Sequence, residues 1–246
     1  MSSAPSALII GSGIGGLVAG ALLARYGYSV TLCESHNIPG GAAHDFTRSG
    51  FRFDSGPSFY CGLSDSHSLN PLRQVLDALE ESVDAIAYDP LGHYHFPEGT
   101  LPIYGNLERY RGAIAQFTPT GAEELKALEA KLLDIYDGLK AIPTLALRSD
   151  FSLIPVLLGR YGWPLLKLLP KSFGLQGSVG DLMDQTISDA FVRRLIDLEC
   201  FLLSGLKAAG TIAPEVAFMF GERTHSVIDY PVGGSGAIVD ALVRCV

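Results

Sequence analysis

Hydrophobic and polar positions near the start of the chain follow a strand, helix, strand order. Residues 7–10 form a short, wholly apolar run, which predicts a buried parallel strand. Apolar residues then recur at helical spacing and predict one helix face, made of Ile14, Leu17, Val18, Ala21 and Leu22. Gly27 ends this helix, and residues 29–33 predict a second strand. Together the three elements predict a βαβ unit.

The middle of the chain predicts short strands and several helices. Short strands are expected at residues 51–54, 85–88, 93–96 and 101–104. Asn70 as a cap and Pro71 in the first turn predict a helix that reaches about Glu81. Apolar residues at three- and four-residue spacing predict one long helix packed on its own domain, with the stripe Leu125, Leu128, Leu132, Ile135, Leu139 and Ile142.

Residues 151–177 form the most apolar region that shows no evident core pattern. Two interpretations stay open: a proline-broken pair of core helices, or an interfacial segment that contacts a membrane through aromatic and basic residues. The aromatic and basic residues alternate along it as Arg160, Tyr161, Trp163, Lys167 and Lys171. Because prolines and charges interrupt the region, it does not predict a membrane span, which needs about 20 mostly apolar residues.

Composition narrows the class of protein. The chain has 246 residues, a formal net charge of −8 and 48% hydrophobic residues, which indicates a folded, acidic protein. No basic run is present, so no nucleic-acid partner is expected. The four cysteines are scattered without a CxxC pair, which favours a reducing compartment over a disulfide framework or a zinc site. No targeting segment is evident before the first strand.

The glycine-rich turn after the first strand carries the strongest chemical signal. Its glycines match the dinucleotide fingerprint: Gly11 for the turn, Gly13 for close approach of a pyrophosphate and Gly16 for helix packing. The helix that follows would place free N–H groups at the phosphates. Glu34, directly after the second strand, is expected to accept hydrogen bonds from ribose hydroxyls, which disfavours a 2′-phosphate and therefore NADP. An adenine dinucleotide is the predicted ligand.

Glu199 is the candidate catalytic residue. On a helix beginning near Ser188, its neighbours three and four residues away are all apolar: Leu195, Ile196, Leu202 and Leu203. Asp197 is expected to pair with Arg193 and Arg194 on the same helix. A carboxyl desolvated without a local partner has a raised pKa and is a candidate proton donor. The alternative is a Glu paired with a distant arginine or bonded to a backbone amide.

Two further groups of residues carry weaker signals. His93 and His95 share one face of a predicted strand, and two imidazoles without a third ligand predict no metal site. The glycine run at residues 233–236 follows Tyr230 and either brings the backbone close to a ligand or precedes a helix capped by Ser235. The two interpretations are compatible.

Several motifs resemble one flavoprotein family. The segment from Glu34 to Gly41 resembles the acid-plus-glycine-pair segment of flavoproteins with two dinucleotide-binding domains, with Ala42 where many members carry arginine. Further motifs occur in the order found in carotenoid isomerases, which are relatives of bacterial-type phytoene desaturases and retinol saturases. These motifs lie at residues 39–41, 51–56, 93–97, 197–201 and 230–234, and the last two are the most specific.

The resemblance implies an α/β fold: a Rossmann-like FAD-binding domain with an inserted α+β substrate domain. The expected parts are residues 1–68, 69–222 and a return segment at 223–246. The implied cofactor is FAD, reduced during turnover, and the implied substrate is an apolar polyene. The residues expected to bind the cofactor are Gly11, Gly13, Ile14, Gly15, Gly16, Glu34, Gly40, Gly41, Gly56, Pro57, Gly233 and Gly234.

The resemblance leaves competing functions open. A desaturase or a saturase differs from an isomerase only in net electron count. Rab GDP-dissociation inhibitors resemble the same glycine-rich fold without doing chemistry, and an inactive fragment is a third interpretation. Against the family the chain is short, and it is expected to lack the C-terminal strands of the FAD domain. The expected location is the plastid in a photosynthetic eukaryote, or otherwise the bacterial cytoplasm or membrane periphery, with membrane contact through residues 151–177.

Overall fold

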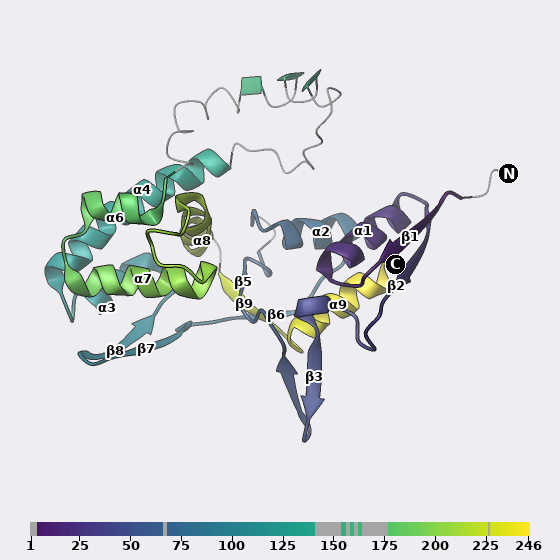
Figure 1. Ribbon diagram of the computed structural model, residues 1–246, viewed down its shortest axis with the longest axis horizontal. Helices are drawn as coiled ribbons and strands as arrows, with labels where there is room; N and C mark the ends of the chain where they lie inside the picture. The colour runs from purple at the N-terminus through teal and green to yellow at the C-terminus, as the bar shows by residue number, and fades with distance from the viewer. Residues whose placement is uncertain are drawn as a thin grey trace. The chain divides into compact units, whose positions relative to one another are not determined.

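The computed structural model describes residues 4–65, 68–140, 154–155, 158–159, 162–163, 177–225 and 227–246 (Figure 1). The chain forms two compact units: unit 1 contains Met1–Tyr88 and Ser226–Val246, and unit 2 contains Asp89–His225. Unit 2 is therefore a single segment inserted into unit 1, as the predicted fold class requires. The domain boundaries expected at 68/69 and 222/223 stay predictions, because they separate a cofactor-binding domain from a substrate domain, whereas the two units are defined by compactness alone.

Unit 1 begins with the predicted βαβ unit. Strand β1 (Ser6–Ile10) pairs in parallel with β2 (Ser29–Cys33), and helix α1 (Ile14–Arg25) connects them. Glu34 follows directly after β2. This order confirms the Rossmann-like fold predicted from the apolar runs and the glycine turn.

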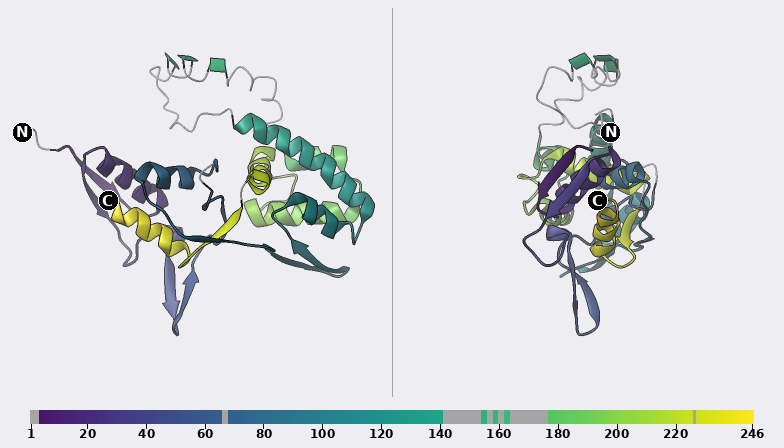
Figure 2. Two further views of the ribbon diagram at one scale, coloured as in Figure 1. Left: turned by 180° about the vertical axis from the view of Figure 1, so that it is seen from behind. Right: turned by 90° about the vertical axis from the view of Figure 1, so that its right-hand side faces the viewer.

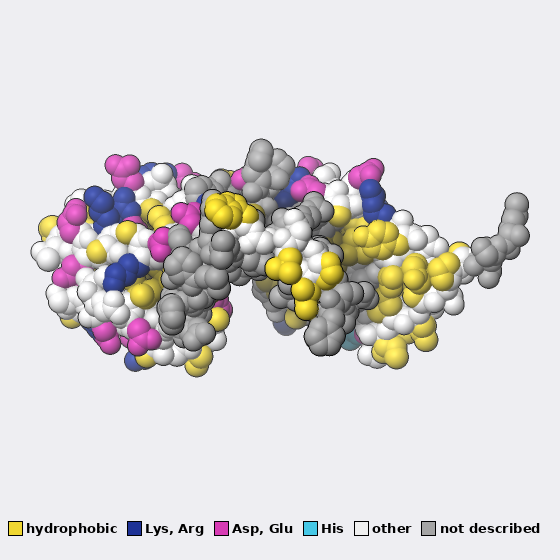
Figure 3. Space-filling view, turned by 90° about the horizontal axis from the view of Figure 1, so that it is seen from above, with side chains coloured by type: hydrophobic (Ala, Val, Ile, Leu, Met, Phe, Trp, Pro, Cys, Tyr) yellow, Lys and Arg dark blue, Asp and Glu magenta, His cyan; other side chains and the backbone are white. Residues whose placement is uncertain are grey.

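The prediction that β1 is a buried strand is wrong for one of its faces. Leu8 is 67% exposed and Ile10 is 87% exposed, whereas Ile9 and Leu32 point toward Gly20 of α1. A buried parallel strand needs cover on both faces, and the described residues cover the β1–β2 pair only on the α1 side. Hydrophobic side chains are also exposed at several other places on the surface (Figure 3).

The rest of unit 1 consists of short strands around three helices. The elements are η1 (Gly41–Ala43), β3 (Asp45–Arg48), β4 (Phe51–Asp54), β5 (Tyr60–Cys61), α2 (Pro71–Leu79), β6 (Ala85–Ala87), β9 (Ile228–Pro231) and α9 (Ser235–Arg244). Strands β3 and β4 form an antiparallel hairpin that extends away from the helices of this unit (Figure 2). A second antiparallel sheet has the order β5-β9-β6.

The core of unit 1 lies between its helices. Helices α1, α2 and α9 contribute the buried side chains Leu17, Ala21, Leu76, Leu79, Ile238, Val239 and Leu242. Asn70 caps α2 by accepting a hydrogen bond from the amide of Leu72, as predicted. The C-terminal helix α9 is therefore part of the same core as α1, the helix that follows the glycine-rich turn.

Unit 2 combines one hairpin with a group of helices. Its elements are β7 (Gly92–Phe96), β8 (Gly99–Ile103), α3 (Leu107–Ile114), α4 (Pro119–Leu139), α6 (Val179–Thr186), α7 (Ala190–Ser204) and α8 (Ala213–His225). The predicted long helix is α4, in which Leu125, Leu128 and Leu132 are fully buried. It packs closely on α8, where a Cβ at Gly221 would overlap the ring of Tyr136. Helix α3 was not predicted, and Ile142 lies outside the described residues.

The apolar region 151–177 lies mostly outside the described residues, so neither of its two interpretations is tested. Within the part of the chain that is described, no helix has the length and apolar character needed to cross a membrane.

Candidate functional site

The glycine-rich turn opens onto the N-terminus of α1. The first hydrogen bond of the helix runs from the amide of Leu17 to the carbonyl of Gly13, so the amides of Ile14, Gly15 and Gly16 precede the helical ladder. No side chain caps this end, and its first turn holds no acidic residue. Around Gly15, no atom lies within 4 Å of where a Cβ would be. Free amides, the helix dipole and open space together fit a pyrophosphate group.

Close packing explains the last glycine of the turn. A Cβ at Gly16 would come closer than 3.0 Å to the carbonyl oxygen of Gly11, a distance that real Cβ atoms do not reach. Gly11 itself has φ +96°, a conformation that favours glycine. The turn therefore keeps its shape only with glycine at these two positions.

Glu34 is fixed beside the turn by hydrogen bonds. Its Oε2 accepts from the amide of Ser12 at 2.7 Å and from the Ser12 hydroxyl at 2.6 Å, while its Oε1 accepts from the amide of His36 at 2.8 Å. These bonds, with the Ser12 hydroxyl first, lower the pKa of Glu34 to about 2. The side chain therefore stays an ionised acceptor at the point where the predicted ribose would lie.

The depressed pKa of Glu34 gives a direct prediction. Replacing Ser12 by alanine removes the largest cause and is expected to raise the Glu34 pKa toward 4.5, whereas Ser35→Ala, which removes only a hydroxyl contact of 3.4 Å and keeps the backbone amide, should leave it near 2. Because the folded-state pKa is depressed, the favourable contribution of this carboxylate is present above pH 4.5 and is lost only as the pH falls through about 2. NMR titration of the glutamate side-chain carboxyl carbons measures both variants. Equal midpoints for the two variants would contradict the assignment to Ser12.

The glycine pair after Glu34 lies against the glycine-rich turn. Gly40 forms a parallel bridge with Gly13, and its amide donates to the carbonyl of Ser12 at 2.8 Å. A Cβ at Gly41 would lie 3.0 Å from the Cα of Gly13. The two glycine groups, separate in the sequence, thus form one stretch of closely packed backbone.

This stretch continues toward the C-terminal segment of unit 1. A Cβ at Gly56 would come closer than 3.0 Å to the carbonyl oxygen of Ala42. The carbonyl of Pro57 accepts from the Ser235 hydroxyl. A Cβ at Gly234 would lie 2.5 Å from Oδ1 of Asp54. The structure therefore connects most of the predicted glycines of unit 1 in one series of contacts, which runs from the turn before α1 to the turn before α9, whereas Gly15 lies beside open space.

The prediction that Ser235 caps the last helix is wrong. Gly234 is the N-cap of α9, and the cap hydrogen bond comes from Asp54, whose Oδ1 accepts from the amide of Ser235 at 2.7 Å. The Ser235 hydroxyl instead bonds the Pro57 carbonyl and accepts from the Tyr60 hydroxyl at 2.9 Å. A carboxylate from β4 stabilises a helix N-terminus better than the hydroxyl next to it, because it carries a full negative charge.

Glu199 lies in the core of unit 2 with partners from other helices. Its Oε1 accepts from the Tyr110 hydroxyl at 2.8 Å and lies 3.9 Å from Nη1 of Arg223. Its Oε2 has no hydrogen-bond partner among the described residues. Burial raises the pKa of Glu199, while Arg223 and then Tyr110 lower it. Glu199 is therefore paired with a distant arginine, Arg223, which is the alternative that the sequence left open.

Sequence reasoning missed the network around Glu199. Arg223 donates through Nη2 to the backbone carbonyl of Tyr104 at 2.6 Å and lies over the ring of Tyr110. A second buried carboxylate, Glu129, pairs with Arg111. Because Tyr110 and Arg223 lie on other helices, the local pattern around Glu199 could not reveal them. The only available signal was the presence of acidic residues in apolar helix faces.

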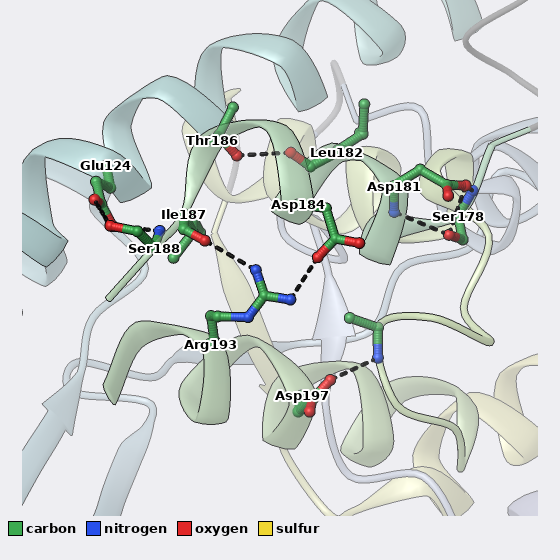
Figure 4. A network of polar contacts seen from close by, with 11 residues as sticks. Glu124, Ser178, Asp181, Leu182, Asp184, Thr186, Ile187, Ser188, Arg193 and Asp197 are labelled. Carbon is green, nitrogen blue, oxygen red and sulfur yellow. Dashed lines mark hydrogen bonds and ion pairs between the residues drawn. The ribbon is translucent and has the colours of Figure 1, made fainter. Parts of the chain in front are cut away.

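The pairing predicted for Asp197 is also wrong. Arg193 pairs with Asp184 and donates to the Ile187 carbonyl (Figure 4). Arg194 pairs with Glu98. Asp197 instead accepts from the amide of Ala208 at 3.0 Å. Asp197, Arg193 and Arg194 thus have partners outside their own helix, and not one another as the spacing suggested.

Unit 2 also contains two histidines on β7 and a surface groove. His93 and His95 are both exposed on β7, and His95 lies 3.0 Å from the Thr100 hydroxyl. In the described part of the chain, no cluster of three or more His, Cys, Asp or Glu residues is placed to hold a metal ion. A surface groove of about 490 Å³ lies between β8 and α3, lined in part by Tyr104, Arg109 and Phe117.

Comparison with known proteins gives the class first. The family described as an NAD(P)-binding Rossmann-like domain matches residues 9–79. Among solved structures, a Pyrococcus furiosus protein has a TM-score of 0.61 at 18% identity, covering 98% of this chain and 48% of its own. A putrescine oxidase variant has a TM-score of 0.60 at 16% identity, with the same two coverages. The fold and the glycine-rich turn therefore define a Rossmann-like domain.

The relatives found by sequence similarity point to a more specific group of enzymes than the fold does. Prolycopene isomerase 2 of an Oncidium hybrid cultivar is 31% identical over 97% of this chain and 40% of its own length. The Arabidopsis thaliana prolycopene isomerase is 32% identical with the same coverages. A neurosporene-forming phytoene desaturase of Cereibacter sphaeroides is 25% identical over 100% of this chain and 45% of its own. The chain is similar in sequence to these prolycopene isomerases and to this phytoene desaturase, and it spans about 40–45% of the length of these relatives.

Proposed function

We propose that the chain forms part of an FAD-dependent, carotenoid-modifying oxidoreductase that isomerises a prolycopene-type polyene from cis to trans. The glycine-rich turn carries the proposal, because the amides of Ile14, Gly15 and Gly16 precede the helical ladder and the open space at Gly15 leaves room for the pyrophosphate of a dinucleotide. The alignment with prolycopene isomerases over 97% of the chain supports the substrate class.

The residues of unit 1 would divide the cofactor between them. The amides of Ile14, Gly15 and Gly16, with Gly11 and Gly13 shaping the turn, would hold the pyrophosphate. Glu34 would accept from the adenosine ribose, sharing its carboxylate with Ser12. The remaining predicted contacts would lie toward the flavin end: Gly40, Gly41, Gly56, Pro57, Gly233 and Gly234.

The chemistry needs few acid–base groups from the protein. Rotation about a conjugated double bond requires its bond order to fall transiently, and a bound reduced flavin supplies the electrons for this without net redox change. The protein would hold the polyene in place and exclude water. Glu199 as a proton donor stays a prediction, and its bonds to Tyr110 and Arg223 favour a structural role.

The reaction itself tests the proposal. The full chain, incubated without oxygen with FAD, dithionite and prolycopene in detergent micelles, is expected to produce all-trans product measured by chromatography. Less product should form with Gly16→Ala at an FAD concentration that half-saturates the wild type, because the turn that would hold the pyrophosphate is then displaced. Glu199→Gln, loaded with flavin to the same extent, separates the two roles of Glu199: wild-type turnover would end its assignment as proton donor. Equal product with and without FAD would contradict the proposed cofactor.

A desaturase is the second candidate, because phytoene desaturases of 25–26% identity align with 96–100% of the chain. The two reactions differ in electron count. A desaturase would reduce oxidised FAD and release a product with an additional double bond, without dithionite. Spectra of the flavin during turnover and the mass of the product discriminate between the two.

Location and membrane contact belong to the same proposal. The plant relatives are named as chloroplastic proteins, which supports a plastid location if the source is a photosynthetic eukaryote. Peripheral membrane contact through residues 151–177 would bring an apolar substrate to the protein. A non-catalytic binding protein, the remaining alternative, would neither bind FAD nor change the polyene.

A further inference from the structure

One face of the β5-β9-β6 sheet in unit 1 is apolar and aromatic. Ile86 of β6 lies directly opposite Tyr230 of β9, so their side chains share a face of the sheet. The ring of Tyr88 lies 6.0 Å from that of Tyr230 and 5.1 Å from that of Phe59. We call Phe59, Ile86, Tyr88 and Tyr230 the aromatic face.

Two residues of the aromatic face are exposed and Tyr88 and Tyr230 are half-buried, whereas the opposite face of the sheet is packed in part. Phe59 is 57% exposed and Ile86 is 62% exposed. On the opposite face, Tyr60 packs against the core of unit 1, and Asp229 is buried with hydrogen bonds from the amide and the hydroxyl of Ser64. Large apolar side chains gathered on one face of a small sheet mark a binding surface.

The aromatic face adjoins one end of the glycine contacts. A Cβ at Gly234 would lie 3.4 Å from the Tyr230 hydroxyl and 2.5 Å from Oδ1 of Asp54. That end of the glycine contacts is where the proposed flavin end of the cofactor would lie. The aromatic face and the proposed cofactor surface are thus continuous within unit 1.

Charge selects the kind of ligand that suits this surface. Burial raises the pKa of the Tyr88 and Tyr230 hydroxyls, and the negative charge of Asp54 raises both further. Both hydroxyls therefore stay protonated and neutral. The cationic Arg52, whose Nη1 lies 3.5 Å from where a Cβ at Gly233 would be, offsets the charge of Asp54 at this end of the sheet, so neither an anion nor a cation is favoured. Flat ring faces interact well with conjugated π systems.

We propose that the aromatic face binds a neutral conjugated polyene, which lies along Phe59, Tyr88 and Tyr230 beside the Gly233-Gly234 turn. This proposal rests on the proposed function for the position of the flavin, because a polyene held here would lie next to that end of the cofactor. It assigns Phe59 and Tyr88, which no motif of the sequence indicated, as substrate-contacting residues.

The test uses diphenylhexatriene, a neutral conjugated probe that fluoresces when it enters an apolar site. The full chain is titrated with the probe, with and without FAD. Phe59→Ala is expected to weaken probe binding about tenfold, which corresponds to about 1.4 kcal/mol, because the variant loses a contacting aromatic ring. Phe51→Ala is the matched control, since Phe51 is also an exposed phenylalanine of unit 1 at 70% exposure but lies on the β3–β4 hairpin. It should change the affinity less than twofold.

Three results would overturn the proposal. The first is an equal probe affinity for wild type and Phe59→Ala, and the second is an equal loss of probe affinity in Phe59→Ala and Phe51→Ala. The third is a dimer, seen by sedimentation, that Phe59→Ala dissociates, because the aromatic face would then be a contact between copies of the chain. Failure of the proposed function has a different signature: the probe binds and Phe59→Ala weakens it, while FAD does not bind.

Discussion

Replacing Arg223 by alanine is expected to lower the free energy of unfolding of unit 2 by about 3–5 kcal/mol, the usual cost of removing one partner from a buried ion pair. Arg223 is almost completely buried, and its loss leaves Glu199 in the core with Tyr110 as its remaining hydrogen-bond donor. The Tyr104 carbonyl also loses its donor. Urea denaturation followed by circular dichroism measures the change, and hydrogen exchange in α3, α7 and α8 assigns it to unit 2.

Arg194→Ala is the matched control for this prediction. Arg194 pairs with Glu98, but both side chains are largely exposed, so the expected loss is below about 1 kcal/mol. The double variant Glu199→Leu with Arg223→Met removes both charges and is expected to recover at least half of the loss. A loss in the double variant as large as in Arg223→Ala would show that packing, and not the uncompensated carboxylate, determines the effect.

The effect of Arg223→Ala should also depend on pH. The pKa of Glu199 is raised in the folded chain, so the folded state holds a proton that the unfolded state releases. Stability from this group therefore falls as the pH rises from the unfolded to the folded pKa. Without Arg223, which lowers the pKa, the folded pKa rises further. The variant is accordingly expected to lose less stability at pH 5 than at pH 8.

Gly16→Ala is expected to have the largest effect on cofactor binding. The new methyl group would overlap the carbonyl oxygen of Gly11, and this backbone atom cannot move aside as a flexible side chain can. Separating the turn from α1 costs about 1–3 kcal/mol of stability. It also displaces amides that would bind phosphate, each worth about 1.5–3 kcal/mol, which corresponds to a loss of affinity for FAD of about 10–100-fold.

Gly112→Ala provides the control for a glycine within a helix. No atom lies within 4 Å of where its Cβ would be, so alanine is expected to stabilise α3 by up to about 1 kcal/mol and to leave FAD affinity unchanged. Thermal unfolding and FAD titration of both variants measure these effects. If Gly16→Ala binds FAD as tightly as Gly112→Ala does, the turn is not the pyrophosphate site.

The local parts of the fold followed from the sequence. The βαβ unit, the Asn70 cap and the buried stripe of α4 depend on short-range patterns, and each lies where its pattern predicted. The position of Glu34 was also predictable from local spacing, because this residue directly follows a strand. The hydrogen bond that links it to Ser12 was not predictable, since it depends on the turn folding back across the sheet edge.

The parts that could not be predicted depend on long-range contacts. Tyr110 and Glu199 are 89 positions apart, and the apolar neighbours of Glu199 on its own helix say nothing about either partner. Asp54 displaced Ser235 as the cap of α9 for the same reason, as it reaches the helix from β4. The exposure of β1 likewise depends on what covers a sheet, which an apolar run does not reveal.

Titration of the full chain with FAD, followed by quenching of flavin fluorescence, tests the central claim most directly. Wild type is expected to bind one FAD per chain with a saturable curve, and Glu34→Leu, which removes the ribose acceptor but no phosphate contact, to bind about tenfold more weakly. An unsaturable curve for wild type, or identical curves for wild type and Glu34→Leu, would contradict the assignment of the glycine-rich turn and Glu34 as the dinucleotide site.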